Sequence, residues 1–135
     1  MACPYFYPVA RAADEGAIPP RLPLGGAFDG ECRASETAIH PDPGTMHKWC
    51  NAGYGRGACP FFPEDAAVDA VRFHIAANSD NVVRLQWIFE KGCWPVDSGF
   101  TDYSIADAKL DPVLTGAVLN RQAVVFIQSC LERLR

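Results

Sequence analysis

The chain has 135 residues, of which 49% are hydrophobic and 21% are charged, and its formal net charge is -4. This length is typical of one domain, and the apolar content is that of a globular protein. The acidic balance argues against a nucleic-acid binder, and no apolar run approaches the ~20 residues of a membrane span. We therefore expect one globular domain over residues 1–135, with no nucleic-acid or membrane partner.

The N-terminus has no basic region followed by a long apolar stretch, so a secretory signal is not expected. This points to a cytoplasmic protein, in which cysteines stay reduced and clustered cysteines more often bind metal or do redox chemistry. A chain of this size buries enough surface to form a core, so its 6 cysteines are not required as staples.

Residues 1–63 are rich in residues that interrupt helices and strands. They hold 8 of the 11 glycines and 9 of the 11 prolines, a composition that predicts turns and loops. A loop segment of this length is uncommon in a compact domain unless something orders it, such as a metal site or a packed second half. We therefore expect residues 1–63 to form a loop-rich, metal-binding half.

Residues 64–135 instead show the alternation and periodicity of regular structure. Runs of alternating apolar and polar residues, bounded by turn residues, predict half-buried strands. Three such runs with short connections predict an antiparallel meander, with strands at residues 71–77, 83–90 and 94–103.

A C-terminal helix is predicted to follow the sheet, with Asp111 as its N-cap and Pro112 in its first position. Apolar residues then recur every three or four positions: Leu119, Ala123, Phe126, Ile127, Cys130, Leu131 and Leu134. This face is expected to cover one side of the sheet. The predicted fold class is α+β, with the loop-rich half packed on a small antiparallel sheet of about three strands and a C-terminal helix.

The six cysteines divide between the two halves. Cys93 follows a turn glycine and Cys130 lies on the apolar helix face, so we expect both to be packing residues. The other four lie in the glycine- and proline-rich half: Cys3, Cys32, Cys50 and Cys59. Loops allow four thiolates to converge on a metal from different directions, and glycine amides donate hydrogen bonds to the sulfurs.

The spacing of these four cysteines favours iron over zinc. Structural zinc sites usually bring ligands in pairs about two to four residues apart, whereas 28, 17 and 8 residues separate the cysteines here. Cys3 and Cys59 are each followed by proline, as a cluster ligand is in bacterial ferredoxins, and aromatic residues crowd the four positions. We expect the four cysteines to bind one [4Fe–4S] cluster; zinc, no metal, or two disulfides are the alternatives.

Several strings around these cysteines resemble a group of small bacterial four-cysteine proteins that has no assigned activity. The strings are Cys3-Pro4-Tyr5-Phe6, Leu22-Pro23-Leu24-Gly25, Gly30-Glu31-Cys32 and residues 50–60. The resemblance covers mainly residues 1–63. It implies that the four cysteines belong to one site, and it implies neither a reaction nor a substrate.

Two further residues are candidates for a role beside the cysteines. His47 precedes Cys50 by one helical turn if that segment is helical, so it is an alternative ligand, a tuning residue or a solvated histidine. Arg56 lies between Cys50 and Cys59, where it either pairs with the negative charge of a four-thiolate cluster or is a solvated loop residue. No recognisable nucleophile motif is present, so no catalytic residue is assigned.

The sequence therefore predicts a small iron–sulfur protein that acts in electron transfer, redox sensing or structure, together with a redox or protein partner. Four protein ligands leave no open iron for substrate activation, so an enzymatic activity is not expected. The alternative is a zinc-stabilised protein-interaction module without redox activity.

Overall fold

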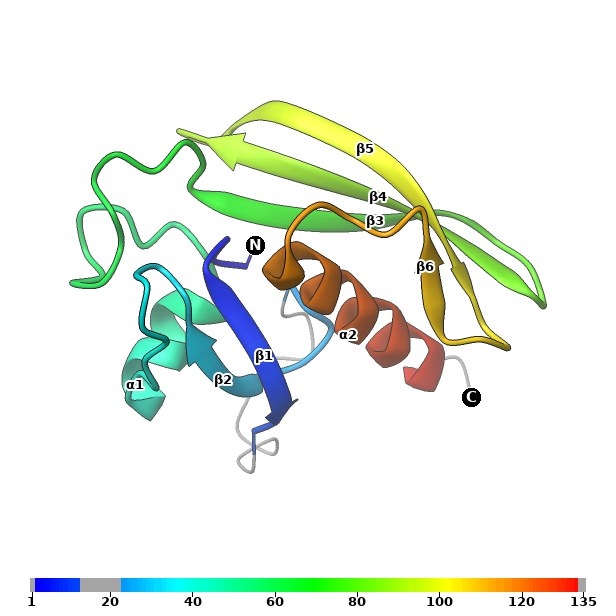
Figure 1. Cartoon of the computed structure of the whole chain (residues 1–135), viewed down its shortest axis with the longest axis horizontal. Coiled ribbons are helices and arrows are strands. Elements are labelled where there is room, and N and C mark those ends of the chain that lie inside the picture. Colours follow the sequence, from blue (N-terminus) through cyan, green and yellow to red (C-terminus); the bar gives the residue numbers. More distant parts are fainter. Residues whose placement is uncertain (1, 13–22, 134–135) are drawn as a thin grey trace.

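The structure, a computed structural model, describes residues 2–12 and 23–133. The C-terminal half forms a four-stranded antiparallel meander of β3 (Ala70–Asn78), β4 (Val82–Lys91), β5 (Trp94–Ser104) and β6 (Lys109–Asp111). Helix α2 (Ala117–Arg133) lies against one face of this sheet (Figure 1). The expected α+β fold with an antiparallel sheet and a C-terminal helix is confirmed.

Alternation along the strands decides which sheet face is buried, because successive side chains point to opposite faces. Val71 of β3 and Val83 and Leu85 of β4 are fully buried beneath the helix. His74 and Arg84 lie between them in sequence and are exposed on the other face. Strand β4 pairs with both β3 and β5, so it occupies the centre of the apolar layer.

The sheet and helix differ from the sequence-based expectation at one junction. The predicted three-stranded sheet has a fourth strand, β6, in which Asp111 pairs with Asp102 of β5. Asp111 is therefore not a helix cap, and Gly116 with φ +89° precedes the actual start at Ala117. Leu134 of the predicted apolar face lies outside the described residues. No helix in the described part of the chain is long and apolar enough to cross a membrane.

The first half is more regular than its glycine and proline content predicts. It contains an antiparallel pair of strands, β1 (Phe6–Arg11) and β2 (Phe28–Cys32). A short helix α1 (Pro43–Thr45) continues into a π-helical turn η2 (Met46–Cys50). Asp42 caps α1 by accepting a hydrogen bond from the Thr45 amide at 2.7 Å. Between and after these elements the half is irregular, chiefly at residues 33–42 and 51–63.

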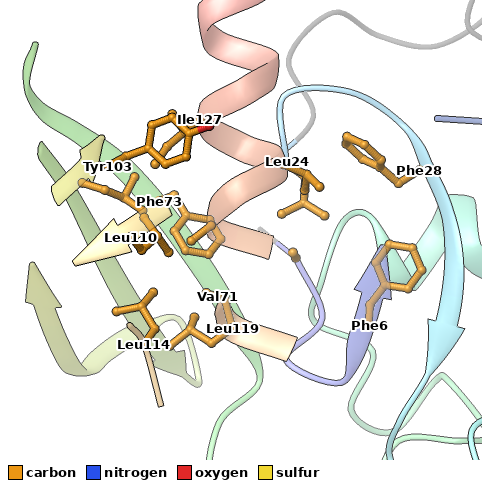
Figure 2. Close-up of a cluster of buried hydrophobic side chains, with 14 of the residues drawn as sticks. Phe6, Leu24, Phe28, Val71, Phe73, Tyr103, Leu110, Leu114, Leu119 and Ile127 are labelled. Carbon is orange, nitrogen blue, oxygen red and sulfur yellow. The ribbon is translucent and has the colours of Figure 1, made fainter. Parts of the chain in front are cut away.

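Helix α2 packs on two sides and thereby joins the two halves. Figure 2 shows buried side chains of the large sheet on one side of the helix, with Phe6, Leu24 and Phe28 on the other side. Arg121 of α2 also donates hydrogen bonds to the backbone carbonyls of Pro8 (2.8 Å) and Val9 (2.9 Å) in β1. One hydrophobic core therefore receives residues from both halves.

Candidate metal centre

The four first-half cysteines line one cavity, although each comes from a different segment. Cys3 precedes β1, Cys32 ends β2, Cys50 ends η2, and Cys59 lies in the loop that follows. The other lining residues are largely apolar or aromatic: Tyr5, Phe6, Ala34, Pro41, Thr45, Trp49, Gly55, Phe61 and Phe62. The empty space among these residues, including its opening to solvent, is about 350 Å³. The structure thus brings together the four cysteines that the sequence analysis grouped.

Backbone pairing holds three of these cysteines in one region. The Cys3 amide donates to the Cys50 carbonyl at 3.1 Å, which joins the N-terminal segment to the end of η2. Cys32 is opposite Phe6 in the β1–β2 pair and exchanges two backbone hydrogen bonds, of 2.7 and 3.0 Å, with Ile39. These contacts make the approach of Cys3, Cys32 and Cys50 a consequence of strand and turn formation.

Asn51 fastens the segment that carries Cys50 to the strand that carries Cys32. Its side chain is 3% exposed; it accepts a hydrogen bond from the Phe28 amide and donates to the carbonyls of Phe28 and Met46, each at 3.0 Å. One buried amide therefore satisfies three backbone groups from two elements. The sequence does not indicate this role, because an asparagine beside a cysteine is equally typical of an ordinary turn.

Gly55 permits the close packing of Cys59 against the cavity wall. A Cβ atom at this position would lie 3.0 Å from the Cys59 Cβ and 3.4 Å from the Trp49 Cβ. The amide of Cys59 donates to the Gly55 carbonyl at 2.7 Å, so the loop folds back on itself here. A larger residue would push Cys59 or Trp49 away from the cavity.

Two side chains between Cys50 and Cys59 anchor this loop to the end of the large sheet. The Tyr54 hydroxyl donates to the buried carboxylate of Glu90, and Arg56 donates to Asp69. Asp69 also accepts a hydrogen bond from the Gly92 amide at 2.7 Å. The loop that carries Cys59 is thus tied to both the start of β3 and the β4–β5 turn.

Arg56 is not among the residues that line the cavity. Its remaining guanidinium donors bind the backbone carbonyls of Glu64, at 2.7 Å, and Ala66. The guanidinium also lies 5.2 Å from the ring centroid of Phe62, which does line the cavity. Arg56 therefore contacts the cavity wall through Phe62, and its charge pairs with Asp69.

The histidines lie away from the cavity lining. His47 is in η2, as the predicted helical spacing requires, but its side chain is exposed and is not part of the cavity wall. His40 is also exposed and contacts Asp29 at 2.7 Å. His74 is exposed on the outer sheet face, as expected from its place in the alternation.

Burial and mutual proximity raise the pKa of three of these thiols, those of Cys3, Cys32 and Cys50. Burial raises the pKa of Cys3 to about 12, with Cys32 and Cys59 adding to the effect and backbone hydrogen bonds opposing it. Burial, together with the charges of the three other cysteines and of Asp42, likewise raises the pKa of Cys50 to about 12. The pKa of Cys32 is also raised, by burial and by Cys59. Each pair of the four therefore interacts, and only a compensating positive charge makes four thiolates favourable at neutral pH.

The four cysteines line one cavity but do not form a ready-made site for a single metal ion. In the described part of the chain, no three or more His, Cys, Asp or Glu side chains form a group that could hold a metal ion. Four sulfurs on one zinc ion would be about 3.8 Å apart, given tetrahedral geometry and bonds of roughly 2.3 Å. The centre of the cavity has room for about one water molecule.

The two remaining cysteines have different surroundings. Cys93 is exposed in the turn between β4 and β5, with φ +68°, and the neighbouring Trp94 is 75% exposed. The expectation that Cys93 packs at the sheet end was therefore wrong, because the hairpin extends beyond the layers that would cover it. Cys130 is half-buried on α2. All six cysteines are described, and none of them forms a disulfide.

Comparisons of the chain with protein-family models, with curated proteins and with solved structures find no match.

Proposed function

We propose that Cys3, Cys32, Cys50 and Cys59 bind one [4Fe–4S] cluster and that the chain is a small iron–sulfur protein. The observation that carries the proposal is the meeting of four cysteines from four segments at one cavity. A cubane cluster takes one cysteine thiolate at each of its four irons. Four thiols around a shared space provide that ligand set.

The spacing of the cysteines along the chain favours a cluster over a single zinc ion, because zinc ligands usually come in pairs about two to four residues apart. Each thiolate of a cubane binds a different iron, so the four sulfurs stand farther apart than four sulfurs on one ion. A cluster also needs more room than one water molecule, so the cavity walls must move outward when it is loaded.

The apolar wall supports a buried cofactor whose potential the protein tunes. Tyr5, Trp49 and Phe62 line the cavity beside the cysteines and lower the local polarity. In such surroundings the thiols of Cys3, Cys32 and Cys50 resist ionisation, whereas iron ions supply the positive charge that stabilises thiolates. Burial and hydrogen bonding to the sulfurs then set the reduction potential.

Ligation by four cysteines leaves no iron position for a substrate. The cluster is therefore suited to electron transfer, redox sensing or a structural role, and we assign no catalytic residue. A redox or protein partner is part of this proposal, as is a cytoplasmic location, where the thiols remain reduced.

Anaerobic reconstitution with iron and sulfide tests the proposal directly. We expect an absorbance band near ~400 nm and about four irons and four sulfides per chain. Serine in place of any one of the four cysteines should abolish or severely reduce this band. Cys93→Ser and Cys130→Ser are the matched controls and should retain it, since neither residue lines the cavity.

Other outcomes of the same preparation would replace the proposal. A colourless protein with one zinc per chain, whose stability collapses in chelator, would instead show a zinc-stabilised interaction module. Six reactive thiols in a metal-free protein that is indifferent to chelator would exclude both metal and disulfides. Two reactive thiols after denaturation without reductant would show two disulfides.

A further inference from the structure

Gln122 is a fully buried amide in the middle of the apolar face of α2. Its side chain is 0% exposed, and it stands between the buried residues Leu119 and Ala123. The side-chain nitrogen donates to the carbonyl of Cys3 at 2.8 Å and to the carbonyl of Phe6 at 2.6 Å. The sequence contains a sign of this role, because Gln122 is a polar residue within an otherwise apolar helix face.

The orientation of this amide follows from its two partners. Both partners are carbonyl oxygens, so only the NH₂ group of Gln122 can face them; the reversed amide would place oxygen against oxygen. The Oε1 atom is then the one buried side-chain nitrogen or oxygen without a hydrogen-bond partner among the described residues. An unsatisfied buried acceptor is destabilising, so the two bonds to the carbonyls must compensate for it.

The two carbonyls belong to the two ends of a single turn, Cys3-Pro4-Tyr5-Phe6. The Phe6 amide closes this turn by donating to the Cys3 carbonyl at 3.1 Å. On its N-terminal side, Ala2 exchanges backbone hydrogen bonds of 2.9 and 2.8 Å with Val71 of β3. Cys3 therefore lies between a residue fixed to the sheet and a turn fixed to the helix.

We propose that Gln122 is a positioning residue for Cys3: its amide holds the turn that keeps the Cys3 thiol at the cavity wall. Its importance for a cluster rests on the proposed function, but its action on Cys3 is testable without iron. A helix that carries no cavity-lining residue thereby sets the position of one of the four thiols.

Gln122→Met removes both donors while it keeps the length and apolar packing of the side chain. Gln128→Met is the matched control, because Gln128 is exposed on the same helix. The measurement is the alkylation rate of each cysteine in the metal-free, reduced protein, resolved by peptide mass spectrometry. We expect Cys3 to react about tenfold faster in Gln122→Met, given the usual worth of a hydrogen bond, with unchanged rates in the control.

The comparison of Cys3 with Cys32 and Cys50 within one protein separates positioning from general stability. A merely structural role would accelerate the alkylation of all three thiols together, whereas a positioning role accelerates that of Cys3 selectively. Equal acceleration of the three, or no acceleration in a folded variant, overturns the proposal. If Gln122→Met does not fold, Gln122→Glu is the second variant, because it keeps the shape of the side chain and, as the neutral acid, retains one donor. We then expect a selective acceleration of Cys3 alkylation that is smaller than the one expected for Gln122→Met.

Chelator-driven cluster loss from the reconstituted protein provides the second readout. The full proposal is supported if Gln122→Met shows selective labelling of Cys3 and also loses its cluster at least about threefold faster than the wild type. A threefold change in rate corresponds to roughly half of the contribution of one hydrogen bond. Selective labelling with unchanged cluster loss overturns the link between Gln122 and the cluster. If the wild-type protein takes up no iron, the proposed function fails, while the labelling experiment still decides the role of Gln122.

Discussion

Helix α2 separates two regions that are held together by different kinds of contact. The sheet region, residues 70–111, is stabilised by repeated strand pairing and by apolar side chains on one face. The cysteine region, residues 2–12 and 23–62, depends on single polar side chains that bind backbone groups, above all Asn51 and Gln122. Both regions pack on the same helix (Figure 1). The different kinds of contact within them therefore follow from their own residues and not from the helix.

The comparison indicates where the molecule tolerates change. In the sheet region many similar contacts share the stabilisation, so one substitution weakens the fold without moving a functional group. In the cysteine region a single amide fixes the segment that carries a cysteine. We therefore expect changes there to alter the thiols as well as the stability.

The largest loss of stability is expected from the sheet region, with Leu85→Ala. Leu85 is 0% exposed at the centre of the core, and its truncation should lower the free energy of unfolding by about 3 to 4 kcal/mol. Urea unfolding measures this, with the partly exposed Val82→Ala as control. Iron uptake by the folded fraction should be unchanged. A loss of iron as complete as that of the cysteine variants would show that the regions are not separable.

Asn51→Leu should have a slightly smaller effect on stability but a larger one on the thiols. It removes three buried hydrogen bonds, at about 1 kcal/mol each, so we expect a loss of about 3 kcal/mol. The Met46 carbonyl keeps its hydrogen bond from the backbone amide of residue 51. Cys32 and Cys50 should then be alkylated faster in the metal-free protein, because η2 is released from β2. The control is Asn78→Leu, an exposed position in β3. If the alkylation rates of Cys32 and Cys50 do not change in Asn51→Leu, then a single amide does not fix the thiols of the cysteine region.

Asp69→Asn tests the contact between the regions and predicts a pH dependence. Burial opposes ionisation of Asp69, but hydrogen bonds from the Gly92 amide and Arg56 outweigh it and lower its pKa. A pKa that is lower in the folded state stabilises the fold at pH values above the pKa of the unfolded chain, which is roughly 4. This contribution disappears as the pH falls through the folded-state pKa.

We therefore expect Asp69→Asn to lower the free energy of unfolding by about 2 kcal/mol at pH 7, the usual contribution of a charged hydrogen bond. When the pH is then lowered, the free energy of unfolding should fall less in this variant than in the wild type. Urea titrations at neutral and acidic pH measure both effects. Asp80→Asn, in the exposed turn after β3, serves as the control. An equal acid-induced loss in Asp69→Asn and the wild type would contradict the assignment.

The smallest effect is expected at the ion pair between β1 and α2. Arg11 and Glu132 are 2.6 Å apart, but their side chains are 38% and 60% exposed. Glu132→Gln should therefore lower stability by only about 0.5 kcal/mol, and the difference should vanish in high salt. A salt-independent loss above about 1 kcal/mol would mean that this pair behaves as a buried one.

The predictability of the fold from the sequence follows the same division. The alternation over residues 71–103 locates three strands closely, because a half-buried sheet repeats its burial every two residues. The short strand β6 lacks enough residues to show a pattern, and its pairing with β5 decides that Asp111 is not a helix cap. The strands β1 and β2 were missed, because their stability comes from contacts with α2 and not from a repeat of their own.

The candidate site shows how far residue types alone can lead. The shared loop context of four cysteines was enough to group them, since proline, glycine and aromatic neighbours distinguish them from Cys93 and Cys130. Their supporting residues were not foreseen. Asn51 and Gln122 act on backbone groups that are respectively up to 23 and up to 119 residues away, and no local pattern records such a partner.

The sequence by itself determined the α+β composition, the core strands and the grouping of four cysteines, because periodicity and local context are properties of the chain. Only the tertiary structure decided that the four segments meet at one cavity, that Arg56 pairs with Asp69, and that a helix glutamine holds the Cys3 turn. These contacts join residues far apart in sequence, and their geometry exists only once both sides of α2 have packed.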